Sequence, residues 1–381
     1  MPNPRSYISI FRSSIRCLSA IVVGILAAAF CIEIVLRLVG YGSVAFLGYG
    51  QYQNNLQLPE LGYAGRPNVN GIQTQEGYSH LILNNLGFHD INVQREKDIG
   101  TFRVVVLGDS LTMATQVEVS ETYVSRSGGA LTSCPALQGK HVEALNFGVG
   151  GYTTSQKYLL MRDFIWGYSP DFVVLQEAPG IPESEINAEQ DVSAHLTIDN
   201  NGHENVDSSF MNSKTYQMRS SIEFTWFLRV SDHSRLLQYI NEFRRKLTAR
   251  MRPKAYKGEA AGVPTKNSSE EKARLLKAIS KIAKSHSTPL VLLLIPDGEA
   301  IDPRNASAPM KSEDEIWWDK QSLDLAIPII NPATSAWNFA RQSRLFLSGF
   351  GKQSGVGHLT RYGNDFIGQE LANEICGLLS R

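Results

Sequence analysis

Signatures of several common functional classes are missing from this sequence of 381 residues. Lys and Arg together number 37, and so do Asp and Glu, so the chain has no net charge and no basic excess of the kind found in nucleic-acid binders. It has only four cysteines, too few for a disulfide scaffold, and they form no CxxC pair typical of zinc or redox sites. We therefore expect no nucleic-acid partner.

Motifs that bind metals and nucleotides are also missing. The sequence has no HExxH, no pair of histidines at ligand spacing and no aspartate-rich calcium loop. Its glycine-rich segment GVGGY, residues 148–152, lacks the GxGxxG spacing and the following acidic residue of a dinucleotide site. We expect neither a metal nor a cofactor.

The four cysteines fall into two pairs. Cys17 and Cys31 lie inside an apolar run, whereas Cys134 and Cys376 could form a disulfide in an oxidising compartment. Two buried thiols are an equally acceptable interpretation, because free cysteine packs as a small apolar side chain. The sequence leaves the choice open.

One long apolar run is present near the N-terminus. The segment CLSAIVVGILAAAFCI has no charge, and residues 17–40 are long enough to cross a hydrocarbon core of about 30 Å. Glu33 and Arg37 lie near its end, four residues apart, so they can pair on one face of a helix. A cleaved signal peptide is the alternative, but the length of the run favours an uncleaved transmembrane anchor.

The charges that flank this run predict its orientation. Three arginines precede it, whereas no Lys or Arg occurs from residue 38 to residue 65. The positive-inside rule then places residues 1–16 in the cytoplasm and the rest of the chain outside it. We expect a single-pass protein of the inner (cytoplasmic) membrane with a periplasmic or surface domain. Residues 41–100, rich in Gly, Tyr, Asn and Gln, are interpreted as an extracytoplasmic spacer.

From residue 101 onward, signals for strands and helices alternate. Short runs dense in Val, Leu and Ile predict five strands, in TFRVVVLGDS, in VEALNFGVGG and at residues 171–175, 289–295 and 326–331. Helical patterns at residues 119–131 and 155–166 lie between them. This alternation predicts a three-layer α/β/α domain over residues 101–381, with a parallel, flavodoxin-like sheet of five strands.

An insertion of about residues 183–270 interrupts this alternation. Residues 224–251 within it place apolar side chains at near-helical spacing and predict a helical segment. The basic run RRKLTARMRPK at its end could contact an anionic surface such as lipid headgroups or an acidic polymer, but a solvated helical face is the favoured interpretation. The role of the insertion stays open.

A candidate nucleophile directly follows the first strand, in Gly108-Asp109-Ser110-Leu111. Ligands of parallel sheets bind outside the carboxyl ends of the strands. A serine hydroxyl also needs a base to accept its proton. Of the eight histidines, His358 is the best placed, in a loop before an amphipathic C-terminal helix whose N-cap we place at Thr360. The non-catalytic alternative is a helix-capping Ser110 and a packed His358.

Three segments resemble the membrane-anchored bacterial SGNH (GDSL-type) hydrolases. They are LNNLGFHD with the following FRVVVLGDSLTMATQVEVSETYV, then ALNFGVGGYTT, and finally GHLTRYGNDFIGQELA. The resemblance implies that Ser110 is the nucleophile and His358 its base. It also implies that the backbone N–H groups of Ser110 and Gly151 form the oxyanion hole.

Two positions depart from the pattern of that family. The third strand continues as QEAPG, without the asparagine that completes the oxyanion hole in the family, and Gln176 is a possible substitute. Gly355 stands where the family has an aspartate that orients the histidine. Either the protein uses a Ser–His dyad or another carboxylate orients the ring, and Asp297 and Glu177 are candidates because each follows a strand.

We therefore expect an extracytoplasmic serine esterase that cleaves O-acyl esters through an acyl-enzyme on Ser110. The resemblance suggests acetyl groups on carbohydrate. Two alternatives stay open: an O-acyltransferase that modifies envelope polysaccharide, and a catalytically degenerate fold that binds glycan. The expected partners are an ester or acylated glycan substrate and, through residues 17–40, the lipid bilayer.

Overall fold

The computed structural model describes residues 4–42, 50–51, 57–73, 76–179, 193–199, 201–251 and 266–381. The chain divides into two compact units. One comprises Met1–Gly48 and Trp226–Ala255, and the other comprises Tyr49–Thr225 and Tyr256–Arg381. Within the insertion expected at about residues 183–270, residues 183–192, 200 and 252–265 lie outside the described residues.

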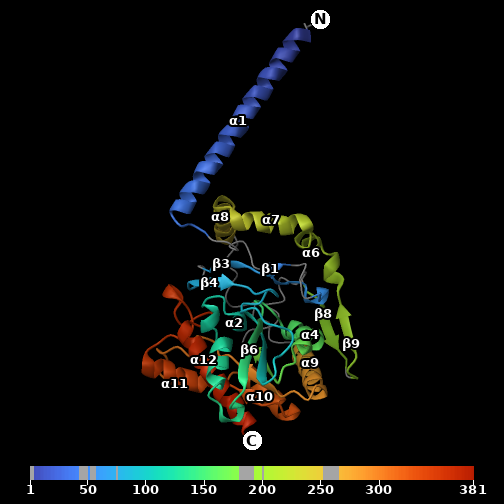
Figure 1. Cartoon of the computed structure of the whole chain (residues 1–381), viewed down its shortest axis with the longest axis vertical. Coiled ribbons are helices and arrows are strands. Elements are labelled where there is room, and N and C mark those ends of the chain that lie inside the picture. Colours follow the sequence, from blue (N-terminus) through green and yellow to red (C-terminus); the bar gives the residue numbers. More distant parts are fainter. Residues whose placement is uncertain are drawn as a thin grey trace. The chain divides into compact units, whose positions relative to one another are not determined.

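The larger unit is built on a five-stranded parallel sheet (Figure 1). Its strands are β5 (Thr101–Gly108), β6 (His141–Gly148), β7 (Phe172–Glu177), β10 (Leu290–Leu294) and β11 (Ile329–Ile330). They are arranged in the order β11-β10-β7-β5-β6. Counted along the chain this order is 5-4-3-1-2, which confirms the predicted flavodoxin-like topology.

The central strands are buried on both faces because helices cover each side of the sheet. Along β5, Val105 and Leu107 face one layer of the core, whereas Val104 and Val106 face the other. Alternate residues of a strand point to opposite faces, so a strand covered on both sides must be apolar throughout. This is why β5 appears in the sequence as an unbroken apolar run.

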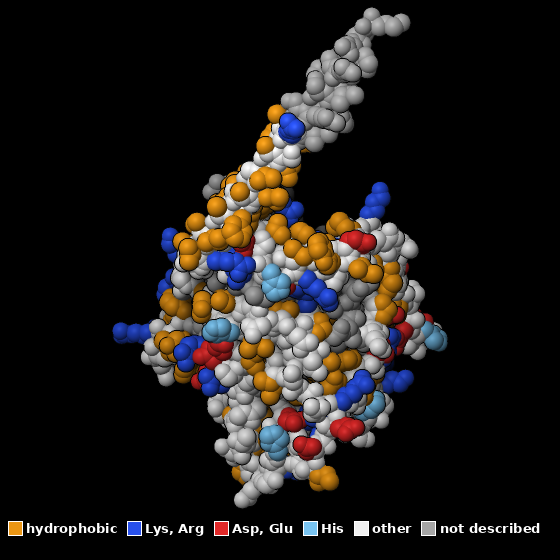
Figure 2. Space-filling view, turned by 45° about the horizontal axis from the view of Figure 1, so that its top comes forward, with side chains coloured by type: hydrophobic (Ala, Val, Ile, Leu, Met, Phe, Trp, Pro, Cys, Tyr) orange, Lys and Arg blue, Asp and Glu red, His pale blue; other side chains and the backbone are white. Residues whose placement is uncertain are grey.

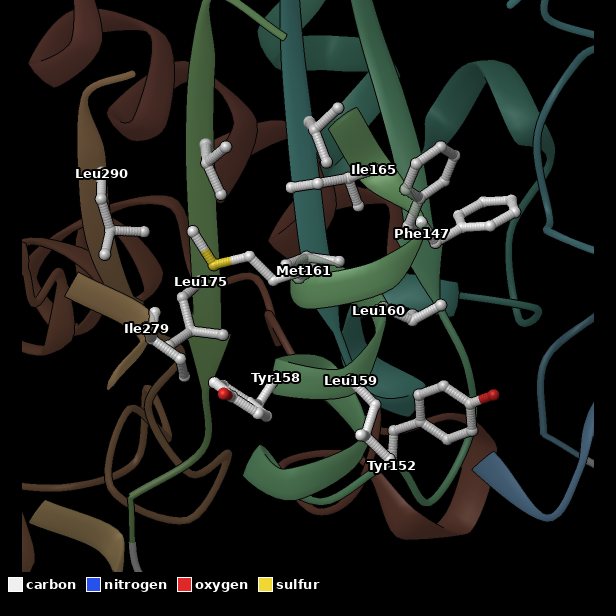
Figure 3. Packing of buried hydrophobic residues seen from close by; sticks show 14 of the residues in the cluster. Phe147, Tyr152, Tyr158, Leu159, Leu160, Met161, Ile165, Leu175, Ile279 and Leu290 are labelled. Atoms are coloured by element: carbon white, nitrogen blue, oxygen red, sulfur yellow. The ribbon is translucent and has the colours of Figure 1, made fainter. Parts of the chain in front are cut away.

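The first face of the sheet is covered by α4 (Thr154–Asp163), α9 (Lys266–Ser285) and α10 (Glu313–Leu325). Figure 3 shows residues of α4 and Ile279 of α9 packed against the strands. The second face is covered by α3 (Tyr123–Leu131) and α12 (Arg361–Leu379). Thr360 caps α12 as predicted, since its side chain accepts a hydrogen bond from the N–H of Gly363. The three-layer α/β/α architecture is confirmed.

The remaining elements are shorter or lie outside the sheet. The helices are α1 (Pro4–Leu38), α2 (Ser110–Met113), α6 (Lys214–Arg219), α7 (Ile222–His233), α8 (Arg235–Met251) and α11 (Ala333–Ser343). Three two-stranded antiparallel pairs are formed by β1 (Gly50–Gln51) with β2 (Ala64–Gly65), β3 (Asn70–Gln73) with β4 (Ser79–Ile82), and β8 (His195–Ile198) with β9 (Glu204–Asp207).

The segment that precedes the sheet packs onto it. Leu61, Ala64 and Phe88 belong to the core on the first face, and the ring of Phe88 stacks on that of Phe147 in β6. The hairpin of β3 and β4 lies within this segment. Part of the stretch expected to be a spacer therefore belongs to the packed body of the larger unit.

The smaller unit contains the apolar N-terminal helix. Residues Arg16–Leu38 of α1 are long and apolar enough to cross a membrane, a property that a signal sequence would share. The Glu33–Arg37 pair expected from the sequence is present, with Arg37 Nε 2.8 Å from Glu33 Oε1.

A disulfide joins Cys134, near the end of α3, to Cys376 in α12. It decides the question that the sequence left open and links two neighbouring helices that are 242 residues apart in the chain. Replacing both cysteines with serine is expected to lower the free energy of unfolding by about 2–5 kcal/mol, because the unfolded chain loses a long-range constraint. Thermal unfolding measured with and without reductant checks this: reductant should destabilise the wild type and leave the double variant unchanged. Equal stability of the two proteins would contradict it.

Candidate active site

Ser110 is positioned by the tight turn at the end of β5. Asp109 caps α2, because its Oδ1 accepts a hydrogen bond of 2.8 Å from the N–H of Leu111. Gly108 is required at this turn, since a Cβ there would lie 1.8 Å from Thr112 Oγ1. The turn places Ser110 at the first position of α2, at the carboxyl edge of the sheet.

His358 reaches the same edge from the other end of the chain. It lies in the loop before α12, where the N–H of Gly349 donates a hydrogen bond to its carbonyl oxygen. Its Nε2 is 2.9 Å from Ser110 Oγ. The structure thus brings together the two residues predicted as nucleophile and base.

The second nitrogen of the imidazole contacts Glu76, a residue that the sequence analysis missed. His358 Nδ1 is 2.6 Å from Glu76 Oε2, and the backbone N–H of His358 donates to Glu76 Oε1 at 3.0 Å. An ionised carboxylate only accepts hydrogen bonds, so Nδ1 carries the proton and Nε2 presents its lone pair to the serine hydroxyl. The arrangement is a carboxylate–imidazole–hydroxyl chain.

Glu76 comes from the loop between β3 and β4, and two glycines allow its approach. Gly357, with φ +95°, precedes the histidine, and a Cβ on it would lie 2.6 Å from Glu76 Oε1. Gly77, with φ +76°, follows the glutamate, and its Cβ would lie 2.8 Å from a ring carbon of Phe350. The only sequence signal for this carboxylate is an acidic residue before a turn glycine, between the short strands NGIQ and SHLI.

The residues proposed earlier as orienting acid or hole donor have other partners. Glu177 pairs with Lys157 at 3.1 Å and accepts a hydrogen bond from Thr154. Gln176 Oε1 accepts from the N–H of Asp109 at 3.0 Å and from Thr112 Oγ1 at 2.9 Å, so this amide holds the nucleophile turn. Asp297 is exposed, and both ring nitrogens of His358 are already occupied.

Both backbone donors expected for an oxyanion are available. Gly151 follows β6 with φ +80°, and Tyr63 holds the preceding residue by donating from its hydroxyl to the Gly150 carbonyl at 2.9 Å. In the part of the chain that the structure describes, no acceptor engages the N–H of Ser110 or of Gly151. These two N–H groups can therefore bind a developing negative charge on a substrate oxygen.

A buried lysine contacts the residues around the turn that carries Ser110. Lys157, in α4, is fully buried, and its Nζ donates to the carbonyl of Gln176 at 2.7 Å. The same Nζ lies 3.1 Å from Glu177 and 3.9 Å from Asp109. A buried ammonium is tolerated only when paired and hydrogen-bonded, so these contacts couple α4 to the ends of β5 and β7. Among the described residues, no group of three or more His, Cys, Asp or Glu side chains could hold a metal ion.

The buried acid Asp90 connects the segment that precedes the sheet to β6. Its carboxylate accepts from the N–H of Asn146 at 2.9 Å and from the N–H of Ile91 at 2.8 Å. Burial nevertheless raises the pKa of Asp90 to about 7, because the charged form loses its hydration. The folded protein therefore binds this proton more tightly than the unfolded chain does.

This raised pKa predicts a pH dependence of stability. The contribution of Asp90 to the free energy of unfolding is fully present below its pKa in the unfolded chain, about 4, and is lost as pH rises toward its folded pKa of about 7. The free energy of unfolding of the wild type, relative to Asp90→Asn, should fall by up to about 4 kcal/mol over that range. Urea unfolding of both proteins at several pH values measures this, with the exposed change Asp98→Asn as control. A difference that stays constant with pH would contradict the prediction.

Comparison of the sequence with protein-family models and with curated proteins gives no match. Comparison with solved structures finds 43 chains with similarity to this one, and three of them illustrate how limited that similarity is. The acetyl xylan esterase AlAXEase is 14% identical, with 72% of this chain and 100% of that one covered and a TM-score of 0.40. Esterase EstA from Pseudoalteromonas sp. is 12% identical, with 73% and 99% covered and a TM-score of 0.37. The lipase/acylhydrolase from Enterococcus faecalis is 13% identical, with 73% and 96% covered and a TM-score of 0.37.

Proposed function

We propose that this protein is a serine esterase that cleaves O-acyl esters through an acyl-enzyme on Ser110. The observation that supports this most directly is the chain of contacts from Glu76 through His358 to Ser110, with distances of 2.6 and 2.9 Å. Nucleophile, base and orienting carboxylate within hydrogen-bond reach are what nucleophilic acyl transfer requires.

In the first half of the reaction, Ser110 Oγ attacks the ester carbonyl carbon and His358 Nε2 takes the hydroxyl proton. The carbonyl oxygen becomes an anion, which the N–H groups of Ser110 and Gly151 stabilise. Each such donor is worth about 3 kcal/mol in the transition state. The tetrahedral intermediate then expels the alcohol, which takes the proton from the imidazolium and leaves the acyl group on the serine.

In the second half, a water molecule attacks the acyl-enzyme while His358 accepts its proton. Collapse of the second tetrahedral intermediate releases the acid and returns the proton to Ser110. Glu76 stays ionised throughout, holds Nδ1–H in place and stabilises the imidazolium that forms twice in each cycle.

The substrate class and the location complete the proposal. The resemblance of the sequence blocks suggests acetyl or other short acyl groups on carbohydrate. We place the larger unit outside the cytoplasm, anchored through residues 17–40, because arginines precede the apolar run. The disulfide between Cys134 and Cys376 supports this location, since disulfides persist mainly in oxidising compartments.

A fluorophosphonate probe on the full-length protein in mild detergent tests the proposal. The probe should modify the Ser110 peptide, as detected by mass spectrometry, and Ser110→Ala should remove that modification. Ser133→Ala, at an exposed position on the same unit, is the matched control. Well-folded protein that stays unlabelled would contradict the enzymatic function and favour the glycan-binding alternative.

Incubation with an acetylated oligosaccharide then distinguishes hydrolysis from transfer. Release of acetate in proportion to ester consumed supports the esterase. Appearance of the acetyl group on a second, unacetylated glycan without equivalent acetate would contradict hydrolysis and indicate an O-acyltransferase, which uses the same acyl-enzyme.

A further inference from the structure

The smaller unit carries an apolar face that the described part of the chain leaves uncovered. Along α8, Tyr239, Ile240, Phe243 and Leu247 recur at helical spacing, so they share one face. Their exposed fractions are 48%, 52%, 59% and 48%. Four large apolar side chains, each about half exposed on a single face, are more than the scattered apolar residues of an ordinary protein surface.

The start of α8 is tied to the end of the apolar helix α1. The carboxylate of Glu33 accepts hydrogen bonds from the backbone N–H groups of Arg235 at 3.0 Å and Leu236 at 2.8 Å. Ser234 donates to the same carboxylate at 3.2 Å. Glu33 therefore caps the positive end of the α8 dipole, which offsets the cost of a carboxylate in an apolar helix.

A second set of contacts joins the end of α1 to α7 and α8. Arg37 bonds Glu33 and donates to the carbonyl of His233, the last residue of α7. After α1 ends, the hydroxyl of Tyr41 bonds Glu242, and its ring packs edge-on against Tyr239. These contacts link the last turns of α1 and the residue Tyr41 after it to the end of α7 and the first half of α8.

The position of Glu33 along α1 sets the depth of this junction. Arg16 and Glu33 are seventeen residues apart, which corresponds to about 26 Å along a helix. If Arg16 lies at one edge of a hydrocarbon core about 30 Å thick, Glu33 lies just inside the other edge. With α1 placed in this way, the first turn of α8 would lie at the level where acyl chains meet headgroups.

We infer that α8 lies in the membrane interface, with its apolar face in the outer layer of the acyl chains. This inference rests on the proposed anchoring by α1 and is independent of the catalytic chemistry. Amphipathic helices bind lipid by burying an apolar face about 5–10 Å into the headgroup boundary, with cationic side chains at the edges. Arg235 and Arg244 lie on opposite sides of the apolar stripe, which suits anionic headgroups.

The surface of this region is consistent with a lipid partner. Figure 2 shows hydrophobic side chains gathered beside the lower end of α1, next to Lys and Arg side chains. Trp226 of α7, 65% exposed, is of the residue type that concentrates at membrane interfaces. The smaller unit would then contact the bilayer twice, through α1 across the hydrocarbon core and through α8 at its surface.

Quenching of a fluorescent label tests the inference on the full-length protein reconstituted in vesicles that contain anionic phosphatidylglycerol. Cys17 and Cys31 are replaced by serine, and the disulfide leaves no other thiol to react. A bimane label is then attached in turn to Phe243→Cys in α8, to Ala27→Cys in α1 and to Leu323→Cys in α10. Leu323 is the matched control, because it is an exposed apolar residue of the other unit.

At position 243, lipids with a nitroxide near the headgroup should quench the label severalfold more than they quench the label at position 323. Aqueous iodide should show the reverse order. A label at position 243 that iodide reaches as readily as position 323, while position 27 is quenched by lipid, overturns the interface position of α8 but not the anchor. Protection of position 243 from both quenchers also overturns it, since a protein surface would then cover the face. Loss of lipid quenching at position 27 overturns the inference together with the anchor.

Discussion

Ser110→Ala should lower kcat for ester hydrolysis by about five to six orders of magnitude, because no other hydroxyl stands 2.9 Å from His358 Nε2 in the described part of the chain. His358→Ala should cost about as much. The double variant should be no slower than either single variant, since the two side chains act as one unit.

Initial rates with a p-nitrophenyl acyl ester at saturating substrate concentration give these values. Active-site titration gives the concentration of active wild-type enzyme. Ser133→Ala controls for the loss of a hydroxyl on the same unit and should keep the wild-type rate. An additive loss in the double variant would show that serine and histidine act separately and would contradict the proposed mechanism.

Glu76→Gln should lower kcat by about three to four orders of magnitude with little change in KM. In Glu76, one carboxylate oxygen accepts from Nδ1–H of His358 and the other accepts from its backbone N–H. An amide has a single oxygen, so it cannot accept both hydrogen bonds in this way. The imidazole is then free to adopt the tautomer that places a proton on Nε2, where it cannot accept the proton of Ser110. Glu76→Asp keeps the charge and should restore part of the rate.

Glu118, which contacts the same hairpin, provides a matched control. Its Oε1 accepts hydrogen bonds from the backbone N–H and from Nδ1 of His80 in β4, at 2.9 and 3.0 Å, so it also holds a histidine through backbone and ring. Glu118→Gln should leave kcat unchanged. Labelling by the fluorophosphonate probe gives a second reading, since Glu76→Gln should slow it and Glu118→Gln should not. Equal kcat values for the two variants would show that Glu76 has no part in orienting the base.

The sequence predicted the architecture because its signals are local. The runs VVVL in β5 and LVLLL in β10 are apolar throughout, and only strands covered on both faces need that pattern. Thr360 could be assigned as an N-cap because capping depends on a residue and its neighbours three positions away. Ser110 and His358 could be singled out for a similar reason, since one follows a strand and the other precedes a capped helix.

The partners of those two residues depended on the tertiary structure. Glu76 and His358 are separated by 282 positions, and a single glutamate in a loop has no periodicity or motif that distinguishes it from a solvated acid. The same holds for Gln176, whose amide proved to brace the nucleophile turn, and for the pairing of Cys134 with Cys376. By itself the sequence determined the layers, the strand positions and the serine and histidine at the edge of the sheet. Which carboxylate contacts the imidazole was decided only by the packing of the β3–β4 hairpin against the loop before α12, because contacts between distant segments depend on the whole fold.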